Sequence, residues 1–196
     1  MGYFLGREGL GMSIGKDGGF TLVEMMVALL VLAVLIVISA PGFSGLIKDN
    51  RMLSHVYAMR AALNGARSEA LSQRNFVTLC RSTDGASCST VAGDWNTGFI
   101  AFLDEDADSV VDDPNDQIFI SKVLDEETLK VTKISGDANW VQFDSRGYAA
   151  NGSQGTFRIC DERGDDYMRG VRITPGGMVV ALDPNDPAIT FTCTTP

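Results

Sequence analysis

Glu24 is the only charged residue in the apolar run from Phe20 to Ile38. An ionised side chain inside a membrane costs about 2.5–3.5 kcal/mol or more, so it usually has a partner and a function. A carboxylate placed there can pair with a buried cation. We therefore expect Glu24 to take part in charge pairing rather than in simple anchoring.

The residues around Glu24 resemble the processing signal and N-terminal helix of type IV prepilins. The match consists of Gly19, Phe20, the segment Thr21–Glu24 and the apolar run that follows. In a secretory signal the cleavage site follows the apolar segment, whereas here the small residues precede it. The resemblance implies that a prepilin peptidase cuts between Gly19 and Phe20 and methylates the new amine. Glu24 would then pair with that amine, on a neighbouring subunit or its own. The alternative is an uncut anchor whose glutamate faces another helix.

A second group of carboxylates could hold a metal ion. Their alternating spacing offers oxygen ligands to a hard cation such as calcium. Serine and asparagine stand where an EF-hand loop needs glycine and glutamate, and no helices are expected on either side. We therefore predict a solvated hairpin tip and no metal site. The residues concerned are Asp104, Asp106, Asp108 and Asp112 as ligands, with Ser109 and Asn115 as the departures.

Four cysteines, all beyond the apolar run, predict two disulfides and an oxidising compartment. Four cysteines allow three pairings. We expect Cys80–Cys88, which closes a local loop, and Cys160–Cys193, which fastens the C-terminal strand. The single histidine, His55, leaves zinc sites and Ser-His-Asp chemistry without support, so we expect neither a cofactor nor an enzyme.

The elements that position these residues begin with the apolar run, which as a helix would be about 28 Å long. Pro41 and Gly42 predict a kink after it. An amphipathic helix is expected from Ile47 to about Arg74. Its predicted apolar face is Leu53, Val56, Leu63, Ala66, Ala70 and Leu71, and its predicted wet side is Lys48, Arg51, Arg60, Arg67 and Glu69.

Short strands are predicted beyond Phe76, separated by turn residues. The segment that starts at Trp95 reads W-x-x-G-(aromatic)-x-x-F-x-D-x-(acidic), which resembles the GspH/FimT family of minor pilins. The likeness is greater to its FimU/FimT-like type IV pilus members than to its secretion-system member. It implies an α+β, pilin-like fold with a long N-terminal helix under an antiparallel two-sheet head. The expected strands are 76–81, 98–103, 117–123, 155–160, 170–174, 178–182 and 189–193.

The expected organisation is a leader peptide over 1–19, a transmembrane and filament-core helix over 20–47, an amphipathic part over 48–75 and a β-rich head over 76–196. The resemblance implies a minor pilin in the tip or priming complex of a type IV pilus. Its implied partners are other minor pilins, the major pilin, the prepilin peptidase and the inner membrane. The chain would cross that membrane once, with its head in the periplasm, before entering the pilus.

Two other functions stay open as alternatives. A type II secretion pseudopilin would share all the features of the membrane segment. A DNA-binding minor pilin would need a basic surface, yet the net charge is −9 and the pI is about 4.5, which argues against nucleic acid as a partner. The Gly-Arg-x-Arg pattern of such relatives is replaced by Gly177–Ala181. The remaining arginines, Arg158, Arg163, Arg169 and Arg172, are diluted by Asp161, Glu162, Asp165 and Asp166.

Overall fold

The computed structural model describes residues 19–90, 93–112, 114–124, 128–184, 186–187 and 192–193, without the side chains of 39–42. The predicted leader lies outside these ranges except for Gly19. Of the expected closing strand 189–193, only Thr192 and Cys193 fall inside them, and neither is in a strand.

The chain divides into two compact units, Met1–Gly45 and Leu46–Pro196. The long helix α1, Leu22–Gln73, contributes to both. Among the described residues no single helix is long and apolar enough to cross a membrane, although the bent pair Leu22–Ile38 and Phe43–Gln73 could do so by length and composition.

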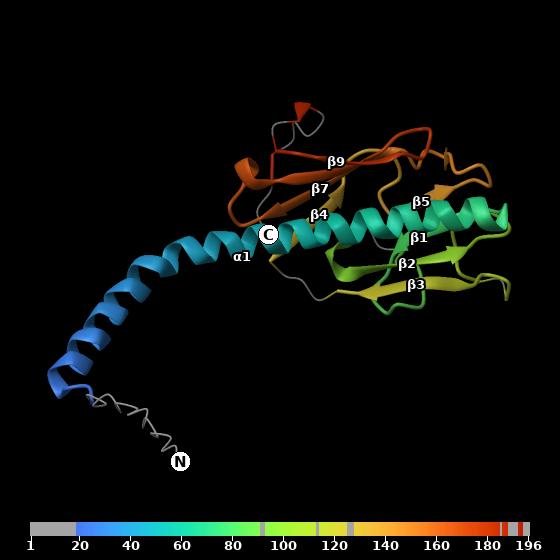
Figure 1. Ribbon diagram of the computed structural model, residues 1–196. Coiled ribbons are helices and arrows are strands. Elements are labelled where there is room, and N and C mark those ends of the chain that lie inside the picture. The colour runs from blue at the N-terminus through green and yellow to red at the C-terminus, as the bar shows by residue number, and fades with distance from the viewer. Residues whose placement is uncertain are drawn as a thin grey trace, which may run out of the picture. The chain divides into compact units, whose positions relative to one another are not determined.

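The head contains two antiparallel sheets (Figure 1). The first has the order β3-β2-β1-β5-β6 and the second the order β4-β7-β8-β9. This architecture confirms the predicted α+β fold with a two-sheet head. The first sheet consists of β1 (Val77–Arg81), β2 (Gly98–Leu103), β3 (Ile118–Val123), β5 (Trp140–Phe143) and β6 (Ala149–Ala150). The second consists of β4 (Leu129–Lys133), β7 (Gly155–Asp161), β8 (Arg169–Ile173) and β9 (Val179–Leu182), and two 3₁₀ turns, η1 (Trp95–Thr97) and η2 (Asp165–Tyr167), complete the head.

Strands β5 and β6 were missing from the sequence prediction, and so was β4. The side chains of β4 alternate between buried and half-buried positions, and Leu129 and Val131 point into the core. This is the period-two pattern of a strand with one buried face. The segment is short and two of its five residues are lysines, which weakens the signal in the sequence.

The second part of α1, from Leu46 to Gln73, lies along both sheets of the head (Figure 1). This part of the helix and the two sheets share one hydrophobic core. Val56, Leu63 and Ala66 are buried in it, as predicted. Leu71 was also expected there, but its side chain is 46% exposed. Successive helical residues are about 100° apart, so the position after buried Ala70 turns away from the sheets. Three further helical residues, Met52, Met59 and Ala62, complete the buried face.

The Trp95 motif is explained by packing at the start of β2. Trp95 is fully buried, lies edge-on to Phe157 with ring centroids 4.9 Å apart, and donates its indole N–H to the carbonyl of Ala138. Gly98 has φ 132°, and a Cβ there would lie 2.4 Å from the carbonyl oxygen of Lys122. The tryptophan thus joins the sheets, and the glycine permits close pairing of β2 with β3.

Candidate assembly site

The helix α1 begins with a side-chain cap that the sequence analysis overlooked. The backbone N–H of Glu24 donates to the hydroxyl of Thr21 at 3.3 Å. Thr-x-x-Glu is the spacing of a capping box, in which the hydroxyl satisfies one of the free N–H groups of the first turn. A carboxylate in the first turn also complements the positive end of the helix dipole. Glu24 therefore stands at a well-defined helix start, close in sequence to the predicted cut before Phe20.

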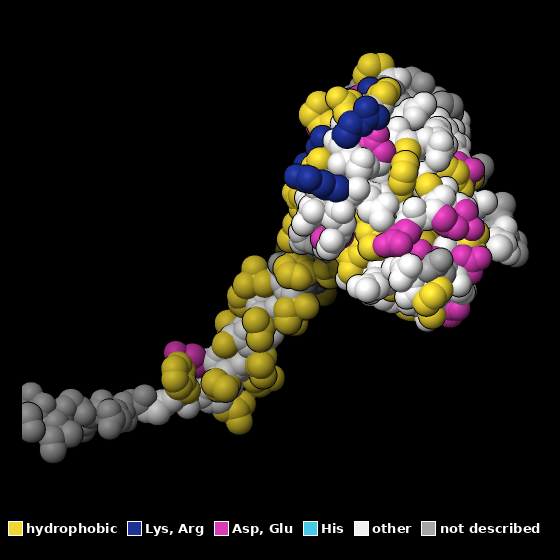
Figure 2. All heavy atoms as spheres, turned by 90° about the vertical axis from the view of Figure 1, so that its right-hand side faces the viewer, with side chains coloured by type: hydrophobic (Ala, Val, Ile, Leu, Met, Phe, Trp, Pro, Cys, Tyr) yellow, Lys and Arg dark blue, Asp and Glu magenta, His cyan; other side chains and the backbone are white. Residues whose placement is uncertain are grey.

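The first part of α1, from Leu22 to Ile38, presents an apolar surface in every direction. Every Leu, Val, Ile and Met side chain from Leu22 to Ile38 is at least 50% exposed within the chain, and Phe20 is 77% exposed. Figure 2 shows hydrophobic side chains covering this segment, with one acidic group near its start. So large an apolar surface exceeds what a soluble monomer exposes and marks a membrane or protein contact.

The head holds the second part of α1 through a cluster of charges around Arg163. Its Nε donates to Asp161 at 2.9 Å, its Nη1 donates to Asp49 at 2.7 Å, and the guanidinium lies 4.1 Å from the centre of the Tyr167 ring. The hydrogen bond to Asp161, followed by the one to Asp49, raises the pKa of Arg163 above its usual value. The turn that connects β7 to η2 is thereby fixed to α1.

A more exposed pair lies beside this cluster. Lys48 and Glu162 are 2.9 Å apart, with side chains 38% and 53% exposed. An exposed pair of this kind contributes about 0–1 kcal/mol to stability. Of these two charge contacts, the one made by Arg163 therefore contributes more to the attachment of the helix.

Arg67 makes a second attachment, although its charge placed it on the predicted wet side. Its Nε donates to the carbonyl of Gly147 at 2.9 Å, and its Nη2 donates to that of Gly176 at 3.3 Å. Gly177 has φ 75°, and a Cβ there would lie 1.9 Å from the Gly147 oxygen. Two turns that are far apart in the sequence thus meet at one arginine side chain, and the glycines in these turns are the only signal of the contact that the sequence offers.

Two disulfides join Cys80 to Cys88 and Cys160 to Cys193, the pairing expected from the sequence. The second attaches the C-terminal segment to β7. Cys160 and Cys193 are buried with Met168 and Leu182 in a small separate cluster. The backbone N–H of Cys193 also donates to Asp165.

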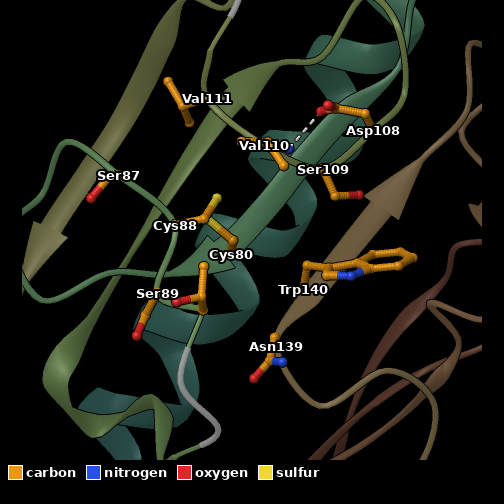
Figure 3. A pocket seen from close by; sticks show the side chains of 11 residues that line it. Cys80, Ser87, Cys88, Ser89, Asp108, Ser109, Val110, Val111, Asn139 and Trp140 are labelled. Carbon is orange, nitrogen blue, oxygen red and sulfur yellow. Dashed lines mark hydrogen bonds between the residues drawn. A yellow bond between two sulfur atoms is a disulfide. The ribbon is translucent and has the colours of Figure 1, made fainter.

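The first disulfide lines a hollow of about 330 Å³ on the head (Figure 3). Figure 3 shows the disulfide between Cys80 on β1 and Cys88 on a loop, Trp140 on β5, and the residues Asp108 to Val111 on the neighbouring loop. Cys80 packs beneath it with Ile100 and Phe102. The hollow combines an aromatic ring, a disulfide and polar loop atoms.

The four arginines considered for nucleic acid differ in their accessibility. Arg163 is 14% exposed and engaged by two aspartates. Arg158 donates to the carbonyl of Thr192, and Arg169 to that of Met168. Arg172 is exposed on β8. The geometry removes Arg163 from any phosphate-binding surface.

The structure separates the predicted site residues into two groups. Gly19, Phe20 and Glu24 belong to the first unit, and the four cysteines belong to the second. The backbone at Pro41 and Gly42 is helical, and the kink expected there stays a prediction. Asp104 was expected at a solvated hairpin tip, but its side chain is fully buried. Its carboxylate accepts hydrogen bonds from Thr78 and Gln142, which lie on the first sheet.

Comparisons with known proteins agree with this arrangement. The family model described as type II transport protein GspH matches residues 56–177. The model described as the prokaryotic N-terminal methylation motif matches residues 14–40. No curated protein matches the chain.

A solved structure of a minor pilin is similar in fold. The type IV minor pilin FimU of Pseudomonas aeruginosa is 22% identical, with a TM-score of 0.52, over 75% of this chain and 96% of that one. The minor pseudopilin EpsH of the Vibrio cholerae type 2 secretion system is 14% identical, with a TM-score of 0.48, over 69% of this chain and 98% of that one.

Proposed function

The chain belongs to the GspH family, and from this premise we propose that it is a minor pilin, a structural subunit of a type IV pilus. We place it in the tip or priming complex, with other minor pilins and the major pilin as partners. Its role is assembly, and its head lies outside the cytoplasm, where the two disulfides are stable.

The observation that carries the proposal is the exposed apolar helix within the match to the methylation motif. Leu22 to Ile38 exposes hydrophobic side chains in every direction, and Glu24 is the one charge among them. In the membrane this segment is solvated by lipid. In a filament the same side chains are covered by the helices of neighbouring subunits.

Glu24 gives this packing its register. A prepilin peptidase cuts between Gly19 and Phe20 and methylates the amine of Phe20, which keeps its positive charge. Pairing of that amine with Glu24 of a neighbour offsets the cost of burying both charges. A glutamate without this partner opposes transfer into the filament.

Mass spectrometry of membranes and sheared pili tests the proposal. We expect a mature N-terminus at methylated Phe20 in both fractions. Glu24→Gln should lower the amount in pili at least ten-fold while the membrane amount stays unchanged. The matched control, Glu69→Gln, alters another glutamate of α1 and should leave both fractions unchanged. An intact 1–19 segment with no pilus fraction would leave an uncut anchored domain instead.

A second candidate function is that of a type II secretion pseudopilin, because the matching family model is described by that transport system. The processing and the role of Glu24 would be the same. Co-purification separates the two: the chain should be captured with pilus subunits if it is a minor pilin, and with secretion subunits if it is a pseudopilin.

A further inference from the structure

Three aspartates lie close together on the loop that follows β2. Asp104, Asp106 and Asp108 each place one carboxylate oxygen within 4.8 Å of the other two. Asp106 and Asp108 are exposed, whereas Asp104 is fully buried. Exposed carboxylates often cluster without binding anything, so the argument depends on Asp104.

The two carboxylate oxygens of Asp104 have different surroundings. Oδ2 accepts hydrogen bonds from the hydroxyl of Thr78 at 2.5 Å, the amide of Gln142 at 2.8 Å and the backbone N–H of Ser109 at 3.2 Å. Oδ1 is equally buried and accepts no hydrogen bond from the described residues. One oxygen is thus saturated, and the other is left without a partner.

A bare buried oxygen needs either a proton or a cation. No described lysine or arginine pairs with Asp104. A cation bound between the three aspartates would satisfy Oδ1 and offset the repulsion among the carboxylates.

The loop also has the conformation that such a site requires. In a twelve-residue calcium loop, positions 1, 3 and 5 supply ligands and a glycine at position 6 makes the sharp turn. If Asp104 is position 1, the glycine position is held by Ser109. The sequence argued against calcium here, yet Ser109 has φ 66°, in the left-handed region that favours glycine. The serine therefore adopts the left-handed conformation for which a calcium loop normally uses glycine.

We propose that Asp104, Asp106 and Asp108 bind a calcium ion. The ligands are all oxygens, and they lie on an irregular loop, which suits the flexible coordination of calcium better than the strict octahedron of magnesium. Asn115 stands at position 12, where a bidentate glutamate would add charge and affinity. The site should therefore bind weakly, with a Kd on the order of 10⁻⁴–10⁻³ M, as in extracellular modules.

The ion would join three adjacent strands. Asp104 directly follows β2, and its hydrogen-bond partners Thr78 and Gln142 belong to β1 and β5. The same loop supplies Asp108 and Ser109 to the hollow beside Trp140 (Figure 3). Calcium would thereby stabilise the first sheet and fix one wall of that hollow.

Calorimetric titration of the full chain in detergent, stripped of divalent ions with a chelator, tests the site. Calcium chloride should give a saturable heat, and magnesium chloride should bind at least ten-fold more weakly. The double variant Asp106→Asn/Asp108→Asn changes only exposed side chains and should weaken calcium binding at least ten-fold. The matched control, Asp166→Asn, removes an exposed carboxylate elsewhere on the head and should bind calcium as the unaltered chain does.

Thermal unfolding gives a second readout. Calcium at 10 mM, about ten times the upper Kd, should raise the Tm of the unaltered chain and of Asp166→Asn, and should leave the double variant unchanged. Absence of a saturable heat at that concentration would overturn the proposal, and so would equal affinity in the double variant. Asp104→Asn can disturb folding by itself, so the decision depends on the exposed pair. Neither result bears on pilus assembly, which is measured separately.

Discussion

Arg163 and Asp49 are 114 positions apart in sequence, and their side chains meet at 2.7 Å. Asp49 lies on α1 near the start of the head, and Arg163 lies on the turn after β7. Arg163 also engages Asp161, whose side chain is only 5% exposed. The arginine is therefore the central member of a charge cluster that attaches the helix to the second sheet.

Replacing Arg163 should destabilise the head. Arg163→Met leaves the buried carboxylate of Asp161 without its partner, which should cost about 2–4 kcal/mol. Lys48→Met, which removes the neighbouring exposed pair, should cost about 0–1 kcal/mol. Urea unfolding of the full chain, followed by tryptophan fluorescence, measures both. Equal losses in the two variants would contradict the central role of Arg163.

Gly177 should tolerate no side chain, unlike the glycine before it. Gly177→Ala places a Cβ 1.9 Å from the Gly147 oxygen at φ 75°. We expect it to cost about 2–4 kcal/mol and to separate Arg67 from its carbonyl partners. At Gly176 the nearest atom to an added Cβ is 3.9 Å away, so Gly176→Ala should stay within about 0.5 kcal/mol of the unaltered chain. Thermal unfolding of the pair checks this, and a similar Tm for both would refute it.

The two disulfides should differ in their contribution to stability. They close loops with sequence separations of 33 and 8 residues. In the chain-entropy description, loss of Cys160–Cys193 should cost about 4 kcal/mol and loss of Cys80–Cys88 about 2.5 kcal/mol. Double serine variants of each pair, compared by urea unfolding, test the order. A larger loss for the short loop would show that native contacts, and not chain entropy, decide the difference.

Lys133 should make stability depend on pH. Burial lowers its pKa to about 8 from 10.5, although Asp137 opposes the shift. Between these values the folded chain has released the proton and the unfolded chain still holds it, so stability rises with pH. The full effect is roughly 3 kcal/mol. It should appear as a rise in the free energy of unfolding from pH 8 to pH 10.5.

The variant Lys133→Met isolates this contribution. It lacks the titrating amine and should lose the rise, whereas Lys122→Met, on exposed β3, should keep it. Urea unfolding at pH 7.5, 9 and 10 provides the comparison. The assignment is wrong if Lys133→Met retains the pH dependence of the unaltered chain.

Features that depend on local order in the chain could be predicted from the sequence. Periodicity indicated α1 and most strands, and the Trp95 motif indicated the start of β2. Strand β4 was missed because its lysines obscure the alternation. Leu71 was wrongly predicted to be buried because it lies at the border of the apolar face of the helix. Residue spacing alone does not show where along the helix surface the contact with the sheets ends.

The sequence by itself determined the apolar helix with its single carboxylate and the methylation motif, because these follow from residue type and spacing along one segment. The α+β class was implied by the family resemblance that these residues and the Trp95 motif carry. Only the tertiary structure decided the environment of each polar group in the head. Arg67 and Arg163 are structural attachments because distant turns bring carbonyls and carboxylates to them. Asp104 is buried because β1 and β5 supply donors to one of its oxygens. The cost of burying a charge depends on neighbours that the chain brings together only when it folds.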